Sequence, residues 1–310
     1  MGDSKAPVVI RAGTDADVHL CLEVLNRSYG TERFTEEWLD WKHRSCPFGA
    51  SRMWLAEGPE GIDGAYFALP WRYRLAGRHV DGVRTVDGGT LPPARGRRVL
   101  GELIRHEYEQ WGPPDRPGVL VATATDDARR SHVRNGALAL PALRYAHCLP
   151  PLRRPARVDS GDSVMDDYAA VDQRGMSTDW SPEALRWRTD RRSGNSYDAS
   201  RLRQADQSNG LVYRVTRAGV ARVLIPVVVW GSVRDQRLLL SSVSLRTRSS
   251  LVMAPSGPGA APLPVRPVRS SGHAWVCVWD RRVEPDRHST SPLADLAGWS
   301  LSYAELEGLI

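Results

Sequence analysis

The stretch Thr90-Leu-Pro-Pro-Ala-Arg-Gly-Arg-Arg-Val-Leu100 separates a strand-like segment from an amphipathic, helix-like segment. A short basic loop with a glycine that leads into a helix is a typical pyrophosphate-binding element, because free backbone N–H groups and the positive end of the helix dipole converge there. This loop also carries Arg95, Arg97 and Arg98, so it is suited to a strongly charged anion. The stretch predicts a site for a coenzyme or for a nucleic-acid phosphate.

The composition indicates an ordinary soluble globular protein with a basic charge balance. Its 310 residues are 41% hydrophobic and 25% charged, and the net charge is +6 at pH 7. Of the 42 basic residues only Lys5 and Lys42 are lysines. This bias is typical of a GC-rich coding sequence, although arginine also binds phosphate with paired hydrogen bonds. Because no contiguous arginine tract stands out, charge alone does not predict nucleic-acid binding.

The cysteines are scattered and form no C-x-x-C pair, so neither a zinc site nor a disulfide framework is expected. They are Cys21, Cys46, Cys148 and Cys277. The first residues carry no signal-peptide pattern, and the longest apolar run, 223–230, is too short to span a bilayer. We therefore expect a cytoplasmic protein with no membrane partner and no metal.

The first half of the chain alternates helix-like and strand-like segments, the pattern of an α/β protein. The strand-like segments are 8–11, 54–57, 64–73, 82–90 and 119–125, and the helix-like segments are 15–28, 36–42, 99–111 and 126–135. Thr35 and Asp126 are expected to cap the helices at whose starts they stand, and Gly136 to end the last one. Gly88 and Gly89 would allow the strand before the loop to bulge.

The second half of the chain repeats part of the first. The segment 35–42 matches 181–188 at a constant offset of 146 residues (181 − 35), with Trp41 opposite Trp187. A strand, a glycine turn and another strand are expected next in both copies, which favours a duplication over chance. The two tryptophans are then expected to be core or lobe-interface residues.

A segment rich in Pro and Arg, 150–158, indicates a linker. We therefore expect an N-terminal lobe at 1–150, a linker at 151–160 and a divergent C-terminal lobe at 161–310. In the second lobe the loop 257–267 has no phosphate pattern at a helix entry, so the chemistry is expected in the first lobe.

The order of elements and the motifs resemble the GNAT acyltransferase superfamily in a tandem, two-lobe bacterial arrangement. In that family an Arg/Gln-x-x-Gly-x-Gly/Ala loop wraps the pyrophosphate of coenzyme A, and Arg95-Gly-Arg-Arg-Val-Leu100 stands in its place. The family's next signature is a strand, a polar cap and a helix with an aromatic residue four positions before a glycine. It matches 119–125, Asp126 and His132-Val-Arg-Asn-Gly136. The resemblance covers 8–149 well and the rest weakly.

The resemblance implies an α/β (α+β) fold of two GNAT-like lobes, each a twisted mixed sheet flanked by helices. It also implies acetyl-CoA or another acyl-CoA as co-substrate, held by the first lobe. The residues implied to contact it are Thr90, Leu91, Arg95, Gly96, Arg97, Arg98, Val99 and Asp126. Arg98 and Leu100 depart from the family, which has small residues there. Either the binding geometry is altered, or the donor differs, or the lobe is degenerate.

Amide formation from a thioester needs a polarised carbonyl, a neutral amine and a proton for the leaving thiolate. In the family a backbone N–H at the splayed strand end polarises the carbonyl, which falls here at about Thr90 or Leu91. His132 takes the position of the family's tyrosine acid and can donate a proton near neutral pH; the alternative is a histidine without a chemical role. Asp87 is a candidate general base, and the carboxylates at 36–37 are further candidates; each is also explained as a solvated or capping group.

The leading hypothesis is an N-acyltransferase that forms an amide from acyl-CoA, with acetyl-CoA as the first choice, and a small-molecule amine. The alternative is an aminoacyl-tRNA-dependent transferase, because the arginines of 153–157 and 191–192 suit a tRNA and tandem GNAT-like lobes also build peptidoglycan bridges. A degenerate, non-catalytic binding protein is the third hypothesis. No serine-hydrolase, P-loop or dinucleotide fingerprint occurs. Neither the acceptor nor the oligomeric state follows from the sequence.

Overall fold

The computed structural model describes residues 8–111, 118–168, 175–203, 208–280, 282, 291, 293–295 and 298–302. The chain forms two compact units, and each combines residues from both halves of the sequence. The first unit comprises Met1–Arg72, Val80–Leu140 and Trp275–Ala294, and the second comprises Tyr73–His79, Pro141–Ala274 and Asp295–Ile310. The segment 151–160, expected as a linker, lies within the second unit, where the Ala156 N–H donates to Ser242 Oγ at 2.9 Å.

The first unit contains a mixed sheet. Its strands in spatial order are β1 (Val9–Ala12), β2 (Arg52–Gly58), β3 (Gly61–Leu75), β4 (Arg78–Thr90), β5 (Val119–Ala124) and β14 (Arg266–Asp280), and β6 (Leu138–Ala139) also pairs with β14. Strand β2 is antiparallel to β1 and β3, whereas β4 and β5 run parallel. Only residues 275–280 of β14 belong to this unit, where they pair antiparallel with β5.

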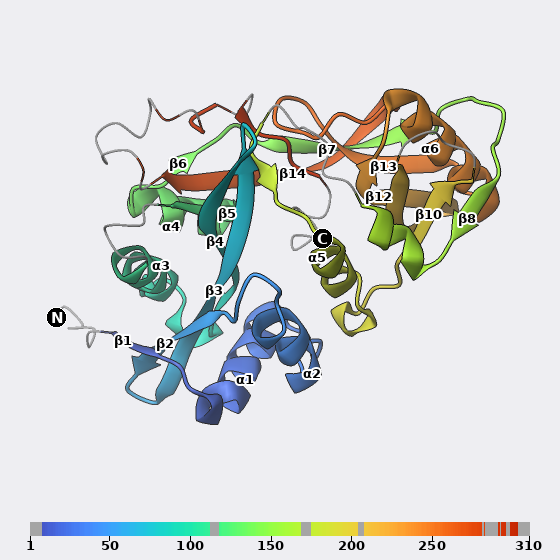
Figure 1. Ribbon diagram of the computed structural model, residues 1–310. Coiled ribbons are helices and arrows are strands. Elements are labelled where there is room, and N and C mark those ends of the chain that lie inside the picture. Colours follow the sequence, from blue (N-terminus) through green and yellow to red (C-terminus); the bar gives the residue numbers. More distant parts are fainter. Residues whose placement is uncertain are drawn as a thin grey trace. The chain divides into compact units, whose positions relative to one another are not determined.

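Helices cover both faces of this sheet (Figure 1). They are α1 (Val18–Tyr29), α2 (Glu36–Leu39), α3 (Val99–Gln110) and α4 (Asp126–Arg134), with the short turns η1 (Asp15–Asp17), η2 (Asp40–Arg44) and η3 (Pro92–Ala94). Helices α1 and α2 share a core with Leu55 and Phe67, and α3 shares a second core with Trp54 and Tyr66. Neighbouring residues of β2 and β3 fall in different cores because successive side chains of a strand point to opposite faces.

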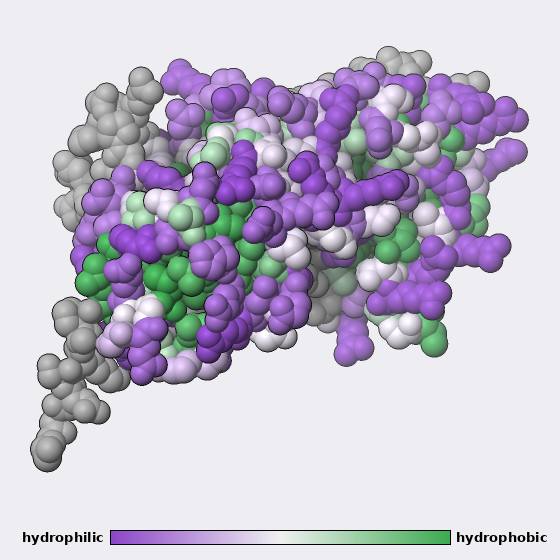
Figure 2. Space-filling view, turned by 90° about the horizontal axis from the view of Figure 1, so that it is seen from below, coloured by the Kyte–Doolittle hydropathy of each residue, from purple (hydrophilic) through white to green (hydrophobic). Residues whose placement is uncertain are grey.

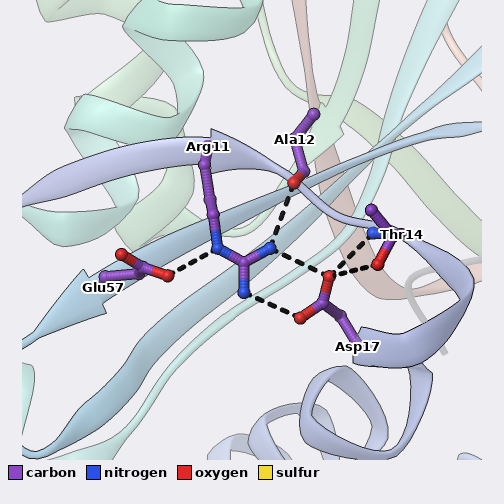
Figure 3. A network of polar contacts seen from close by, with 5 residues as sticks. All are labelled: Arg11, Ala12, Thr14, Asp17 and Glu57. Carbon is purple, nitrogen blue, oxygen red and sulfur yellow. Dashed lines mark hydrogen bonds and ion pairs between the residues drawn. The ribbon is translucent and has the colours of Figure 1, made fainter.

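Charged side chains fasten β1 to the start of α1 (Figure 3). Arg11 donates to the two carboxylate oxygens of Asp17 at 2.9 and 2.7 Å, and it also donates to Glu57. Asp17 accepts two further hydrogen bonds from the N–H and the hydroxyl of Thr14, both at 2.8 Å. These bonds, first those from Arg11, hold the pKa of Asp17 below its usual range. The network fixes the helix entry to the edge strand.

The second unit also contains a mixed sheet. Its strands in spatial order are β14, β7 (Leu143–Leu149), β13 (Leu251–Ser256), β12 (Ala221–Trp230), β11 (Gly210–Ala218), β10 (Asp198–Leu202) and β8 (Val158–Ser160), and β9 (Ser177–Thr178) pairs with the end of β3. Its helical elements are α5 (Pro182–Arg188), α6 (Val233–Thr247), η4 (Asp162–Asp167) and η5 (Arg191–Ser193). Helix α6 packs on this sheet through Leu239, Leu240 and Val243. Strands β12 and β13 run parallel, as β4 and β5 do.

The two matched segments both begin with a capped helix. The Thr35 side chain caps α2 and the Ser181 side chain caps α5, and Trp41 and Trp187 are both buried. The expected match downstream is wrong by one strand, because β10 intervenes between α5 and the hairpin β11–β12. Since β12 pairs parallel with β13, that hairpin corresponds to β3–β4 of the first unit and not to β2–β3.

The cap of α4 differs from the expectation. Its N-cap is Thr125, whose side chain accepts a backbone hydrogen bond, and Asp126 is the first residue of the helix. The Asp126 carboxylate accepts a hydrogen bond from the indole N–H of Trp275. The helix ends at Arg134, shortly before Gly136 with its φ of 91°, as predicted.

Hydrophilic side chains cover most of the face shown in Figure 2, and hydrophobic side chains are visible there in groups. No described helix is both long and apolar enough to cross a membrane. Among the same residues, no group of three or more His, Cys, Asp or Glu side chains is placed to hold a metal ion. The four cysteines are buried and free.

Candidate functional site

The loop 91–98, where the sequence predicts an anion site, connects β4 to α3 in the first unit. It follows a point at which two parallel strands separate. Strands β4 and β5 are paired as far as Thr85 and Ala122. Strand β4 then continues to Thr90 without further pairing to β5 among the described residues. Asp87 lies just beyond the last pair and has a φ of 49°, a left-handed conformation that interrupts the strand. The two strands thus part directly before the loop.

The irregularity expected at Gly88 and Gly89 is centred on Asp87, and the glycines serve close packing. A Cβ on Gly88 would lie 2.7 Å from the Tyr66 ring, and one on Gly89 would lie 2.9 Å from the Ser28 Cβ. Larger residues at these two positions would therefore push α1 and the neighbouring strand away from β4.

The loop leaves a row of backbone N–H groups without an acceptor. Gly96 has a φ of 84° and Arg98 a φ of 63°, and Arg98 precedes α3 without a side-chain cap. In the described part of the chain, the following N–H groups donate to no protein acceptor: those of Gly96, Arg98, Val99, Leu100 and Gly101. Left-handed residues beside helical ones turn successive N–H groups toward one point, as in phosphate sites. Gly96 and residues 98–101 therefore present open backbone donors of the kind that bind phosphate, and their role as a pyrophosphate site stays a prediction.

Arg98, which stands where the family has a glycine, does not close this row. Its backbone adopts the left-handed conformation, which costs a non-glycine residue about 1 to 2 kcal/mol, and its side chain is exposed. Arg95 is also exposed and donates to the Ser28 carbonyl at 2.8 Å, whereas Arg97 is held by Asp63 at 2.7 Å. The loop therefore keeps an anion-binding backbone and two exposed guanidinium groups despite its departure from the family pattern.

The two amides expected to polarise the donor carbonyl are engaged within the protein. The Thr90 N–H donates to Ser28 Oγ at 3.2 Å, and the Leu91 N–H donates to the Asp63 carbonyl at 2.9 Å. A substrate oxygen would have to displace one of these acceptors. The structure therefore presents neither amide as a free oxyanion donor.

His132 lies in the core of the first unit. It is 3% exposed, and its Nδ1 is 2.9 Å from the Tyr108 hydroxyl, whose ring stacks on Trp279. Burial lowers the pKa of His132 to about 4. The imidazole is therefore uncharged at neutral pH and is a poor proton donor there. This geometry does not favour His132 as a leaving-group acid, and packing against Tyr108 accounts for its contacts.

Asp87 lies with three polar side chains beside α1 and α2. Its Oδ2 is 2.6 Å from Lys42 Nζ and 3.2 Å from His43 Nε2. His43 Nδ1 is 2.8 Å from Ser51 Oγ, and the His43 ring stacks on Phe67 with 3.9 Å between centroids. Lys42 and His43 belong to the π-helical turn η2, and Ser51 directly precedes β2. We call this series of contacts, Ser51–His43–Asp87–Lys42, the Asp87 array.

The array holds one ionised carboxylate and one neutral imidazole at neutral pH. Burial by itself raises the pKa of Asp87, but the charge of Lys42 and the contact with His43 outweigh it and hold that pKa below its usual range. Burial lowers the pKa of His43 against the opposing effect of Asp87. A carboxylate of this kind is a weak proton acceptor, so Asp87 is better suited to an electrostatic role than to that of a general base.

The sequence analysis did not predict the three partners of Asp87. Lys42 offered a signal, because it is the only lysine among the described residues and ends the repeated segment 35–42. His43 offered no such signal, since the sequence does not place Ser51, which precedes β2, or Asp87 of β4 beside it. The carboxylates at 36–37 are exposed in the first turn of α2 and do not join the array.

Comparison with known proteins gives matches in fold. The chain matches no protein-family model and no curated protein. A GCN5-related N-acetyltransferase from Anabaena variabilis superposes with a TM-score of 0.68 at 11% identity, over 89% of this chain and 73% of that chain. A tandem GNAT protein from the clavulanic acid biosynthesis pathway gives 0.55 at 13% identity, over 90% and 100%. N-myristoyltransferase from Saccharomyces cerevisiae with bound myristoyl-CoA gives 0.55 at 11% identity, over 92% and 86%.

The chain therefore has the GNAT fold in its tandem form, as predicted. Identities of 11 to 13% establish the fold alone. What the site does has to be argued from the loop, the separated strands and the Asp87 array.

Proposed function

We propose that this protein is an N-acyltransferase that transfers an acyl group from acyl-CoA to a small-molecule amine. Acetyl-CoA is the first choice of donor. The observation that carries the proposal is the set of free N–H groups at Gly96 and at 98–101, after the point where β4 and β5 separate. Proteins of this fold include N-acetyltransferases and an N-myristoyltransferase with bound myristoyl-CoA. The fold and the loop together support acyl-CoA as the donor.

The residues present fit the diphosphate of coenzyme A. The free amides supply hydrogen-bond donors, and the exposed guanidinium groups of Arg95 and Arg98 supply positive charge. Val99 is buried beneath the loop and anchors the first turn of α3 in the core. The loop is therefore held in place before any ligand binds, which lowers the ordering cost of binding.

In the proposed reaction the amine nitrogen forms a bond to the thioester carbon and the carbon–sulfur bond breaks. An alkylammonium must lose one proton before it attacks, and its nitrogen loses a second one afterwards. The departing thiolate takes up one proton, so one proton in total is released to the solvent. Because His132 is buried and neutral, water is the proton source that this scheme uses for the thiolate.

Isothermal titration with coenzyme A and with pantetheine tests the donor site. Pantetheine lacks the diphosphate, so we expect coenzyme A to bind at least 100-fold more tightly, because several charge-assisted hydrogen bonds are lost with the phosphates. Thiol release from acetyl-CoA in the presence of an amine panel then tests transfer. Failure of coenzyme A to bind at millimolar concentration, or equal affinity for both ligands, would contradict the proposal.

An aminoacyl-tRNA-dependent transferase is the second candidate, because the arginines of 153–157 are exposed. Other arginines of this unit are ion-paired, such as Arg192 with Asp190 and Arg203 with Asp159. Gel shifts with charged and uncharged tRNA at low and moderate salt separate the two candidates, since phosphate-driven binding weakens steeply with salt. A shift specific to charged tRNA, together with no affinity for coenzyme A, would favour the tRNA-dependent reaction.

A further inference from the structure

The net positive charge of the chain is concentrated in two segments of the second unit. They are 150–157, which connects β7 to β8, and 233–248, which comprises α6 and its C-cap. Together they hold seven arginines and one carboxylate, that of Asp235. The rest of the chain has 35 basic and 35 acidic residues (42 − 7 and 36 − 1), so these two segments account for the whole net charge of +6.

The two segments lie side by side (Figure 1). The Ser241 hydroxyl of α6 donates to the Arg153 carbonyl at 3.0 Å, and Ser242 Oγ accepts from the Ala156 N–H at 2.9 Å. Both serines are buried, since segment 150–157 covers the middle of the helix. The arginines of this segment therefore lie next to those of α6.

One side of α6 carries the arginines, and the other packs on the sheet. Residues three or four positions apart share a side of a helix, so Arg234, Arg237 and Arg248 lie on the side of Ser241. These arginines are exposed, as are those of segment 150–157. We call this exposed surface the α6 surface, and its arginines are Arg153, Arg154, Arg157, Arg234, Arg237 and Arg248.

The charge of the α6 surface is not compensated within the described part of the chain, where these six arginines form no ion pair. The nearby carboxylates have other partners, because Asp235 accepts from the Ser232 hydroxyl at 2.6 Å and Asp159 is paired with Arg203. Arg246, the remaining arginine of α6, donates to three neutral hydroxyl groups. They belong to Ser160, Ser200 and Tyr213.

Aliphatic side chains are exposed among these arginines. Leu152 follows two prolines and is 97% exposed, and Leu245, four residues after Ser241, is 64% exposed. Unpaired arginines interspersed with exposed aliphatic residues are typical of peripheral surfaces that bind anionic lipid. Neither segment contains an aromatic residue, so the surface lacks the rings on which single-stranded nucleic acids stack their bases.

We propose that the α6 surface binds the anionic phospholipid surface of a membrane. Its arginines contact lipid phosphates, and Leu152 enters the boundary between headgroups and acyl chains. The expectation of no membrane partner rested on the absence of a spanning segment and of a signal-peptide pattern, and neither bears on a peripheral contact. The inference goes beyond acyl transfer and does not depend on it.

Both kinds of side chain are needed for a stable contact. An arginine close to an anionic membrane contributes about fivefold in affinity, and this contribution weakens with salt. Partial burial of a leucine side chain adds roughly tenfold and does not weaken with salt. The proposal therefore predicts binding that depends on anionic lipid, on salt and on Leu152.

Sedimentation with vesicles tests the proposal on the full chain without acyl-CoA. One set of vesicles contains phosphatidylcholine alone, and the other contains phosphatidylcholine with phosphatidylglycerol. We expect the protein to sediment with the mixed vesicles only, and less of it at moderate than at low salt. Absence of binding to the mixed vesicles at low salt, or equal binding to both sets, would overturn the proposal.

The contribution of the arginines is tested by a double variant, Arg153→Gln with Arg154→Gln. Its affinity for the mixed vesicles should fall roughly ten- to thirtyfold, as expected for two arginines at an anionic surface. The matched control, Arg78→Gln with Arg134→Gln, removes the same charge from exposed positions outside the α6 surface and should change the affinity little. Equal losses in the two double variants would show that net charge alone drives binding, contrary to the proposal.

The contribution of Leu152 separates a membrane from a nucleic acid. Leu152→Ser should lower vesicle affinity roughly tenfold, whereas Val133→Ser, at an exposed position of α4, should not. A polarity-sensitive dye on Leu152→Cys should shift its emission to the blue with mixed vesicles and not with tRNA. Such labelling is selective because the four native cysteines are buried.

A gel shift with tRNA gives the outcome that would assign the surface to RNA. Loss of tRNA binding in the double arginine variant but not in Leu152→Ser, together with no vesicle binding, would overturn the membrane proposal. Circular dichroism of each variant checks that it is folded. Titration with coenzyme A should be unaffected by these variants, and failure of the wild type to bind coenzyme A would contradict the proposed function while leaving this inference intact.

Discussion

Helices α3 and α6 occupy corresponding places in the two units, each after the strand that pairs parallel with the next one. Their first turns differ in chemistry. At α3 the N-cap is Arg98, which is left-handed and provides no side-chain cap. At α6 the N-cap is Ser232, whose Oγ accepts from the Asp235 N–H at 3.1 Å and donates to the Asp235 carboxylate at 2.6 Å.

The comparison teaches that this fold does not by itself provide an anion site. The entry of α6 satisfies one of its own amides and places a carboxylate in the first turn, which repels a phosphate. The entry of α3 leaves its amides open and surrounds them with arginines. The two helix entries therefore offer different groups to an anion, with open amides and arginines at α3 and a capped amide beside a carboxylate at α6.

The largest expected effect is a loss of folding stability at low pH that arises in the first unit. His132 is buried there with a pKa of about 4, below the ordinary 6.5. Between these pH values the unfolded chain binds a proton that the folded one does not, so stability present above pH 6.5 is lost as the pH falls toward 4. The loss reaches about 3 kcal/mol.

Urea denaturation of the wild type and of His132→Phe at several pH values measures this loss. The variant should have a clearly smaller pH slope than the wild type, whatever its stability at pH 7, with the remaining slope including that of the buried His43. Hydrogen exchange at pH 5 should place the weakened amides in the first unit. Equal slopes for the two proteins would show that His132 is not the group responsible.

The second-largest effect is expected from a variant that places a carboxylate at the start of α3, as Asp235 does at the start of α6. Arg98→Asp places a carboxylate that tolerates the left-handed conformation beside the open amides. We expect the affinity for coenzyme A to fall roughly 10- to 100-fold, the range for losing a hydrogen bond to a charged group. Calorimetry checks this, with Arg217→Asp as a control of equal charge change on the exposed end of β11. Similar affinities in the two variants would break the comparison.

Removing the cap of α6 has a smaller effect. Ser232→Ala should lower the free energy of unfolding by about 1 kcal/mol, the usual cost of a lost N-cap. The affinity for coenzyme A and its stoichiometry should not change, because Asp235 still places a carboxylate in the first turn of α6. A second equivalent of bound coenzyme A would show that the second unit holds a latent donor site.

The smallest effect is expected from the variant that restores the glycine found at this position in the GNAT pattern. Arg98→Gly relieves the left-handed strain at this position, so the free energy of unfolding should rise by about 0.5 to 1 kcal/mol. The affinity for coenzyme A should change by no more than a few-fold, since one exposed guanidinium is lost while the open amides remain. A loss as large as that of Arg98→Asp would place most of the binding in the Arg98 side chain.

The sequence predicted the tandem fold and the loop, because both rest on local patterns. Gly96 and the helix that follows it determine which N–H groups stay open, and these residues are adjacent in the chain. Helix α6 and strand β13 were not predicted. Buried serines such as Ser241, Ser242 and Ser244 interrupt the apolar period of α6, so its pattern resembles an exposed segment.

The Asp87 array was beyond prediction for a different reason. Its members come from the turn after α2, the start of β2 and an irregular point of β4, and the π-helical turn alters the direction of Lys42 and His43 relative to an ordinary helix. The spacing to Gly136 singled out His132 as a candidate acid. Spacing alone could not show that its ring turns toward Tyr108 in the core.

Each unit takes strands from distant parts of the sequence, and this has a consequence for synthesis of the chain. Strand β5 completes its pairing only with residues 275–280, and β7 pairs with β13 and β14, which are made more than a hundred residues later. A nascent first half therefore waits on the ribosome with an open sheet edge and an unpartnered β7, both prone to wrong pairing. Chaperone demand and sensitivity to premature termination should be set by this delay, and neither half should be obtainable as a well-folded fragment.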